Sequence, residues 1–574
     1  MYEAVRWSSN QVNVYALRKV IQNSKELILK QGKVTSLHIV KKEVELEELL
    51  KCGLDKKRPL SNEPFQADGL NEDQRLAGEF VLRSKDAVTG VRGIAGVGKT
   101  RTIKTFVQAI GHDRIFSCAP TTEAVNELKS IPKGSVGTMQ GFLKNPSQHK
   151  TVRNGVIILD EAGMVGLEDM LEMIKIARKQ NARLILSGDT GQHGSVPYGD
   201  ALRQLEEGGF YRYAEITNVL RQKDPKYREA VILAAEKRPD AAMEKLEELE
   251  WVSEGADPHG KAVDAYMQIL ADGKDVLMVA PGIEDRKKVT EMVRGKLRKQ
   301  GKLGANVPIK VFNPNGWTEE QKKESTLYRR NMTIYFPIKT GDFQAHERVR
   351  VTAASRGIIT VEREDGRSAM FHPKQLDGFE VGTNEPIPLA AGERLMLKES
   401  RHATGGSAGF TNGELVTVTS IDPVTREATL DDGRVLPADY CKYRYAYAST
   451  SPSAQGKSIT EIIAVVTRLS GKAVNREQFY VSISRGKWSC QLFTDDKKWL
   501  EERNRDTTER EFGFKLLDQV PLEQLRAAAR MALSKVSHER VQAIQQARVI
   551  QKSSPKVSDE VPPDENHDAP DIDP

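Results

Sequence analysis

Residues 93–100 read GIAGVGKT and fit the pattern G-x-x-x-x-G-K-[ST], directly after an apolar run that ends at Val91. Glycines in this motif let the backbone adopt positive φ, so that successive N–H groups, with the start of the next helix, cradle phosphate. Lys99 would then reach the β and γ phosphates, and Thr100 would offer a hydroxyl to Mg²⁺, which prefers hard oxygen ligands. The alternative is a glycine-rich turn that happens to precede a lysine. The motif predicts a chain that binds a nucleoside triphosphate and Mg²⁺.

A second apolar run, residues 156–159, ends in Asp160 and Glu161. In a parallel sheet such a run is buried on both faces, and its carboxyl end opens onto the ligand crevice. Asp160 would lie behind Mg²⁺, and Glu161 would polarise the attacking water as general base. An acidic pair after a strand is also common as the charged N-terminus of a helix. Because phosphoryl transfer needs a phosphate loop and carboxylates together, the pairing with residues 93–100 favours a catalytic site.

Other polar residues stand beside apolar segments and are candidates for the same site. Gln192 follows the run 184–188 and would sense the γ-phosphate. Arg221 and Arg485 each end an apolar segment, where a guanidinium would meet transferring phosphate, although either arginine alone would also suit a surface. Upstream, Asn71 is the expected cap of a helix in which Gln74 would hydrogen-bond an adenine edge.

These expectations define a set of site residues. The predicted catalytic residues are Lys99, Glu161, Gln192, Arg221 and Arg485. The predicted metal ligands are Thr100 and Asp160. The predicted nucleotide-binding residues are Gln74, Gly93, Ile94, Ala95, Gly96, Val97, Gly98, Lys99, Thr100 and Arg101.

Taken in order along the chain, these motifs resemble a superfamily 1 DNA helicase of the RecD-like branch. The resemblance covers about residues 65–500. It rests on Gln74, the phosphate loop, APTT at 119–122, GTMQ at 137–140, DEAG at 160–163, GDTGQ at 188–192, Arg221, SAQGKS at 453–458 and SR at 484–485. The sequences of residues 188–203 (GDTGQHGSVPYGDALR) and 451–458 (SPSAQGKS) are most similar to the helicase half of the relaxase/helicase proteins of conjugative plasmids.

The resemblance implies an enzyme that hydrolyses ATP between two RecA-like domains and moves 5′ to 3′ on single-stranded DNA, with duplex junctions as a further partner. Phe142 or the segment 144–153 would form the wedge that splits the duplex, with a plain loop as the alternative. A DNA-dependent ATPase that remodels nucleoprotein without separating strands also stays open. The residues that the resemblance places toward single-stranded DNA are Pro120, Thr121, Thr138, Gln455 and Ser458.

The chain departs from this family in two respects. Members commonly have a histidine where Pro452 stands, and a proline removes a backbone donor and fixes φ, so the link between nucleotide and DNA sites would be altered. Full-length relatives also nick DNA, with clustered metal-binding histidines and a tyrosine near the N-terminus. The 10 histidines of this chain are scattered from His38 to His567 without ligand-like spacing, so nicking is not predicted.

The expected fold class is α/β, with two tandem RecA-like P-loop domains built on parallel sheets, a small SH3-like β insertion in the second, and an N-terminal appendage. The appendage is expected at residues 1–62, with helices around 14–29 and 43–50. The first motor domain is expected at 63–217, and the second at 218–300 and 440–503 around the insertion at 301–439. Residues 504–552 are expected to be helical, and the acidic residues 553–574 to be disordered.

Composition is consistent with these expectations. A chain of 574 residues with 39% hydrophobic content suits several domains. We find neither the roughly 18 to 20 continuous apolar residues that a membrane span needs nor a charged-then-apolar leader, so a cytoplasmic protein without membrane contact is expected. The 4 cysteines are widely spaced and support neither a disulfide framework nor a zinc site. Aromatic residues make up only 6%, which favours tracking of the DNA backbone over sequence reading.

Overall fold

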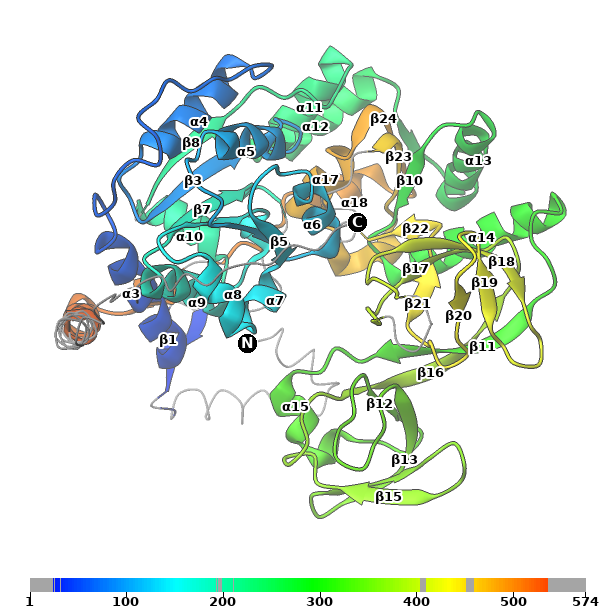
Figure 1. Cartoon of the computed structure of the whole chain (residues 1–574). Coiled ribbons are helices and arrows are strands. Elements are labelled where there is room, and N and C mark those ends of the chain that lie inside the picture. Colours follow the sequence, from blue (N-terminus) through cyan, green and yellow to red (C-terminus); the bar gives the residue numbers. More distant parts are fainter. Residues whose placement is uncertain are drawn as a thin grey trace, which may run out of the picture. The chain divides into compact units, whose positions relative to one another are not determined.

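The computed structural model describes residues 24, 26–30, 33–192, 194, 199–209, 211–402, 409–450, 459–510 and 512–534. The chain divides into two compact units, whose elements are labelled in Figure 1. The larger unit spans Gly53–Glu511, and the smaller combines Met1–Cys52 with Phe512–Pro574. None of the helices in the described ranges is both long and apolar enough to cross a membrane.

The first of two parallel sheets lies in the larger unit, with its strands in the order β5-β4-β6-β7-β3-β8. All neighbouring strands pair in parallel. The strands are β3 (Val88–Gly93), β4 (Ile115–Ala119), β5 (Ser135–Thr138), β6 (Val156–Leu159), β7 (Arg183–Gly188) and β8 (Arg212–Ile216). Every residue of β4, β6 and β7 is buried, as expected for strands covered on both faces. The strands predicted near 115–118, 156–159 and 184–188 are confirmed.

Helices accompany these strands. They are α4 (Glu72–Arg83), α5 (Lys99–Gln108), α6 (Thr122–Leu128), α7 (Met139–Leu143), α8 (Pro146–Thr151), η1 (Ala162–Met164), α9 (Leu167–Lys179) and α10 (Ala201–Gly208). Of these, α4, α6, α7 and α8 each begin at a side-chain cap. The predicted cap Asn71 accepts a hydrogen bond from the backbone N–H of Gln74 at 2.9 Å, and the Gln74 side chain accepts one from the Asn71 N–H at 3.1 Å. This reciprocal pair is a capping box, which fixes the start of α4 and the place of Gln74.

The second parallel sheet has the strand order β22-β10-β23-β24-β9, again with every pair parallel. Its strands are β9 (Val252–Glu254), β10 (Val276–Val279), β22 (Ala448–Ser449), β23 (Ile459–Val465) and β24 (Gly486–Thr494). Its helices are α11 (Pro225–Ala235), α12 (Pro239–Glu248), α13 (Pro258–Ala271), α14 (Ile283–Lys299), η3 (Arg468–Ala473), α17 (Arg476–Ile483) and α18 (Lys497–Asn504). The predicted α/β class with two tandem RecA-like domains is confirmed.

Between β10 and β22 the chain forms two antiparallel sheets and two large apolar clusters, one of which contains residues of both sheets. One contains β11 (Val307–Pro314), β12 (Thr333–Phe336), β13 (Glu347–Ser355), β14 (Ile358–Glu362), β15 (Ser368–Phe371) and β16 (Glu380–Leu389), with α15 (Glu319–Lys323) and η2 (Ser325–Leu327) between β11 and β12. The other contains β17 (Arg394–Leu397), β18 (Leu415–Ile421), β19 (Ala428–Leu430), β20 (Val435–Leu436) and β21 (Tyr443–Tyr445). Because β21 pairs with β17, this β region continues past residue 439. Its SH3-like character stays a prediction.

The smaller unit joins the two ends of the described chain. It contains β1 (Leu27–Lys30), β2 (Lys33–Ser36), α3 (Leu37–Lys51), η4 (Gly513–Leu516) and helical residues 519–534. The carboxylate of Glu43 accepts hydrogen bonds from the backbone N–H groups of Gly513 and Phe514, each at 3.0 Å, and burial raises the pKa of Glu43 to about 7. Arg526 and Arg530 reach Glu47 and Glu48 on the same helix.

Within this unit the helix predicted around 43–50 is confirmed as part of α3. The helix predicted over 14–29 is wrong at residues 27–29, which form β1 and pair antiparallel with β2. Pairing with a neighbouring strand, which local periodicity does not report, decides the conformation there. Residues 14–23 lie outside the described ranges. The helix expected in 504–552 is present at 519–534, and residues 535–552 are not described.

Candidate active site

The phosphate loop joins the end of β3 to the start of α5. Gly96 and Gly98 have φ of 89° and 82°, in the left-handed region that favours glycine. A Cβ on Gly96 would lie 2.7 Å from the Cβ of Arg221, so there is no room for a side chain at this position. The Lys99 ammonium donates to the carbonyl of Gly93 at 2.7 Å and lies across the loop. The loop thus folds around glycines and places Lys99 over its own backbone.

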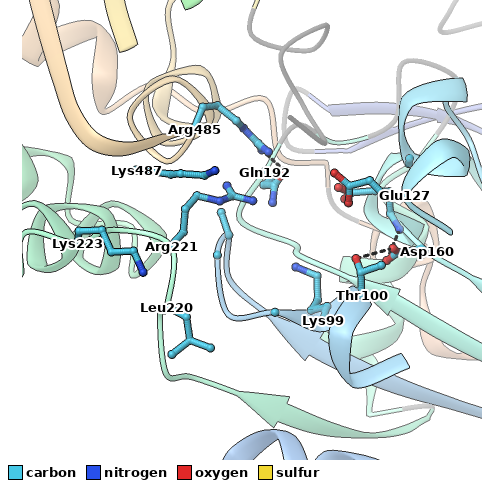
Figure 2. A pocket seen from close by; sticks show the side chains of 15 residues that line it. Lys99, Thr100, Glu127, Asp160, Gln192, Leu220, Arg221, Lys223, Arg485 and Lys487 are labelled. Carbon is cyan, nitrogen blue, oxygen red and sulfur yellow. Dashed lines mark hydrogen bonds between the residues drawn. The ribbon is translucent and has the colours of Figure 1, made fainter. Parts of the chain in front are cut away.

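A cavity of about 480 Å³ opens at this loop, within the size range of small-molecule sites. Figure 2 shows Lys99, Thr100 and Asp160 on one side and Arg221, Lys223, Arg485 and Lys487 on the other. Every predicted catalytic residue and both predicted metal ligands line this cavity; they are Lys99, Thr100, Asp160, Glu161, Gln192, Arg221 and Arg485. Lys99 and Arg485, more than 380 positions apart in the chain, therefore line one cavity. A hydrogen bond from the Ala95 N–H to the Tyr480 hydroxyl joins the same two parts of the chain.

The acidic side of the cavity is built at the end of β6. One oxygen of Asp160 accepts hydrogen bonds from Ser187 Oγ at 2.7 Å and from the Glu161 N–H at 3.0 Å. Its other oxygen lies 3.5 Å from Thr100 Oγ1. The first oxygen is thus fixed by the protein, while the second faces the cavity beside a hydroxyl. This pair of hard oxygens beside the phosphate loop fits the needs of Mg²⁺.

Glu161 combines backbone strain with a shifted pKa. Its φ of 50° is rare for a residue with a side chain, and such strain gathers at functional sites. Burial, followed by the neighbouring Asp160 carboxylate, raises the pKa of Glu161, while Lys99 and Arg485 oppose the shift. A carboxylate whose pKa is raised in a cleft is a stronger base than one in water, which suits proton abstraction from a water molecule.

The basic side of the cavity belongs to segments around the second sheet. Arg485, with 1% of its surface exposed, donates to Gln192 Oε1 at 2.7 Å through Nη2, and burial lowers its pKa. Its Nε has no partner among the described residues. Arg221 donates to the carbonyl of Ser484 at 2.9 Å, and burial lowers the pKa of Arg221 to about 10. A buried guanidinium with an unsatisfied N–H beside a phosphate loop is the chemistry of an anion site.

Sequence comparisons agree with this geometry. Residues 69–257 match the family model of an AAA domain. The chain is 24% identical over 506 residues to the multifunctional conjugation protein TraI of Escherichia coli strain K12, a match that covers 76% of this chain and 28% of TraI. It is 22% identical over 506 residues to the RecBCD enzyme subunit RecD of Haemophilus influenzae, which covers 78% of this chain and 72% of that subunit. These matches agree with the resemblance of the chain to RecD-like proteins of superfamily 1.

The chain spans less than a third of the length of the TraI relatives that it matches. A crystal structure of the Pif1 helicase from Candida albicans is 14% identical, with a TM-score of 0.41, and the match covers 75% of this chain and 98% of that one.

Gln74 contacts the phosphate loop directly. It is fully buried and donates through Nε2 to the carbonyl of Val97 at 2.7 Å. Because its Oε1 is used in the capping box, the amide positions the loop in this structure, and the adenine contact stays a prediction. Arg101 is exposed and points toward Gly69. The predicted nucleotide-binding residues that do not line the cavity are Gln74, Gly93, Ile94, Val97 and Arg101.

Three of the residues predicted to face DNA gather at the carboxyl edge of the first sheet. Ala119 pairs with Thr138 in β4 and β5, so Pro120, Thr121 and Thr138 lie together. Both threonine hydroxyls cap helices, accepting from the N–H groups of Ala124 at 3.2 Å and Gly141 at 3.1 Å. Among the described residues neither hydroxyl has an acceptor for its proton, which suits donation to phosphate. Gln455, Ser458 and Pro452 lie outside the described residues.

The wedge predicted at Phe142 is wrong in this structure. Phe142 is fully buried and stacks on Phe116 with ring centroids 4.4 Å apart. Its ring belongs to the packing of α7 against β4, so it is not presented to a duplex. The neighbouring segment 144–153 is not a plain loop, because it contains α8, none of whose residues is buried.

The sequence analysis missed several residues of this site. Glu127 on α6 lines the cavity, and burial raises its pKa. Lys223 and Lys487 line it too, each two positions after a predicted arginine, and this repeated spacing was a usable signal. The Lys223 N–H donates to the Lys487 carbonyl at 2.9 Å, which holds the two segments side by side.

Proposed function

We propose that this chain is an ATP-dependent DNA helicase that moves 5′ to 3′ along single-stranded DNA, with Mg²⁺ as cofactor. The observation that carries the proposal is the cavity where the phosphate loop and Asp160 meet Arg221 and Arg485. ATP hydrolysis in a cleft lined by two RecA-like domains can change how each domain grips DNA, which is what translocation requires.

The side chains divide the chemistry among themselves. Lys99 and the loop amides hold the phosphates, and the Thr100 and Asp160 oxygens hold the metal, which supplies charge neutralisation and orientation of the triphosphate. Glu161 takes the proton from the attacking water. Arg221 and Arg485 stabilise charge on the transferring phosphoryl group, and Gln192 ties Arg485 to the first sheet.

The choice of DNA as partner rests on the relatives and on the sheet edge. The matched proteins are named for conjugation and for the RecBCD enzyme. Single-stranded DNA against Pro120, Thr121 and Thr138 would run along the carboxyl edge of the first sheet. Duplex junctions are the expected second DNA partner. The direction of movement follows from the resemblance alone, and plasmid conjugation or another DNA-processing reaction is the proposed setting.

A strand-separation assay tests this function. Labelled duplexes with a 5′ or a 3′ single-stranded overhang are incubated with the chain, Mg²⁺ and ATP. We expect separation only with the 5′ overhang, and none when ATP is replaced by a non-hydrolysable analogue. Separation from the 3′ overhang alone would reverse the polarity. DNA-stimulated ATP hydrolysis without separation of either substrate would replace the helicase by a DNA-dependent ATPase.

Replacing Arg485 with lysine is expected to lower DNA-stimulated ATP hydrolysis at least about tenfold, because an ammonium cannot reproduce the planar fork that holds two oxygens at once. Because lysine keeps the positive charge, a fall in the rate of hydrolysis would come from the lost geometry of the guanidinium. Steady-state turnover and nucleotide affinity are the measurements, and affinity should change little. The matched control is Arg505→Lys, at an exposed arginine paired with Asp240, where almost no change is expected. If Arg485→Lys kept turnover within about twofold of the parent, Arg485 would have no role in hydrolysis.

A further inference from the structure

Tyr480, on α17, is buried with 1% of its surface exposed and lies beside the phosphate loop. Its hydroxyl accepts a hydrogen bond from the backbone N–H of Ala95 at 2.7 Å. The same hydroxyl donates to the carboxylate of Asp189 at 2.7 Å. Burial and the neighbouring Asp189 raise the pKa of Tyr480, so the hydroxyl keeps the proton that it donates. One oxygen from the second domain therefore holds two groups of the first domain.

Asp189 directly follows β7 and connects Tyr480 to Gln192. Its Oδ2 also accepts from Gln192 Nε2 at 2.8 Å, and its Oδ1 accepts from the Gly191 N–H at 3.0 Å. Gln192 Oε1 in turn accepts from Arg485 at 2.7 Å. Asp189 and Gln192 are both at most 5% exposed.

The hydrogen bonds form a chain from Ala95 through Tyr480, Asp189 and Gln192 to Arg485. It starts at the phosphate loop, crosses to α17, returns to the first sheet and ends just after α17. Buried donors and acceptors are costly to leave unpaired. Moving α17 away from the loop would break the bonds from both Tyr480 and Arg485, so the network favours one arrangement of the two domains.

We propose that Tyr480 is a positioning residue that couples the phosphate loop to Gln192 and Arg485. This inference rests on the proposed ATP hydrolysis. It identifies a side chain of the second domain that holds the phosphate loop and Asp189 of the first domain in place. By holding Asp189 Oδ2, the hydroxyl fixes the carboxylate that orients Gln192, and Gln192 orients the guanidinium. Tyr480 itself is not among the residues that line the cavity. Its loss should lower the rate of the chemical step while leaving the affinity for ATP nearly intact.

The chain offers a matched control in Tyr227 on α11. Tyr227 is also fully buried and donates its hydroxyl to the carbonyl of Ile483 at 2.5 Å, a contact inside the second domain. Tyr227→Phe and Tyr480→Phe each remove one buried hydroxyl and keep the ring. They differ in that only the Tyr480 hydroxyl reaches the phosphate loop and Asp189.

The experiment measures kcat and KM for ATP with saturating single-stranded DNA, and the melting temperature, for the parent, Tyr480→Phe, Tyr227→Phe, Asp189→Asn and the Tyr480→Phe/Asp189→Asn double variant. We expect Tyr480→Phe and Asp189→Asn each to lower kcat at least about tenfold, with KM within about threefold of the parent. Tyr227→Phe should keep kcat within about twofold. The double variant should be no slower than the slower single variant, because both changes break one connection.

Two results would overturn the coupling while leaving ATP hydrolysis in place: Tyr480→Phe behaving as Tyr227→Phe does, or losses in kcat that multiply in the double variant. If Tyr480→Phe does not fold, Asp189→Asn alone decides, and a kcat equal to that of the parent overturns the proposal. A parent chain that hydrolyses no ATP with or without DNA would remove the proposed function and this inference with it.

Discussion

Replacing Lys99 with alanine is expected to abolish ATP hydrolysis and to leave the fold intact. The ammonium lies across the phosphate loop, 2.7 Å from the Gly93 carbonyl, where it would exchange that contact for phosphate oxygens. No other lysine belongs to this loop. Alanine is the best helix former and stands here at the first position of α5, so the helix should persist. Steady-state ATPase assays and a thermal melting curve make the two measurements.

The matched control for this variant is Lys179→Ala. Lys179 is an exposed lysine in the last turn of α9, so its replacement removes the same charge and volume far from the cavity. It should hydrolyse ATP at the parental rate. Near-normal turnover by Lys99→Ala, together with a native melting curve, would mean that the phosphate loop does not hold ATP in the proposed way.

The phosphate loop and the acidic strand end were predictable because each is contiguous in sequence. Residues 93–100 carry the whole loop, and residues 156–159 form an apolar run that is buried on both faces. A parallel sheet brings the carboxyl ends of its strands to one edge, so a strand-end carboxylate near a phosphate loop needs no long-range information. For the same reason Asp160 and Glu161 were found without a structure.

The connection between Tyr480 and Asp189 was not predictable, since the two residues are 291 positions apart and neither stands in a pattern that names its partner. A buried hydroxyl needs an acceptor, but which acceptor is decided by how α17 packs against the loop after β7. The helix predicted at residues 27–29 was wrong for a related reason. These residues belong to β1, whose four residues depend on β2 for their hydrogen bonds. Local periodicity reports neither kind of pairing.

Replacing Glu161 with glutamine is expected to leave binding of ATP and Mg²⁺ in place and to slow hydrolysis at least about a hundredfold, since a general base contributes roughly 10² to 10⁴ in rate. Glutamine keeps the size and polarity of the side chain at the strained position with φ of 50°. Its neutral amide oxygen is far too weakly basic to accept the proton. Single-turnover hydrolysis and nucleotide binding, measured separately, distinguish a lost base from a lost ligand.

The pH dependence gives a second readout. Burial and Asp160 raise the pKa of Glu161, and only the deprotonated carboxylate acts as base, so the parental rate should fall as pH drops through that raised pKa. Glu161→Gln should show no such acid limb. The comparison variant is Glu127→Gln, because Glu127 lines the same cavity and burial raises its pKa too. If Glu127→Gln were the variant that lost both the rate and the acid limb, the base would be Glu127, and the strained turn after β6 would serve only to hold the metal.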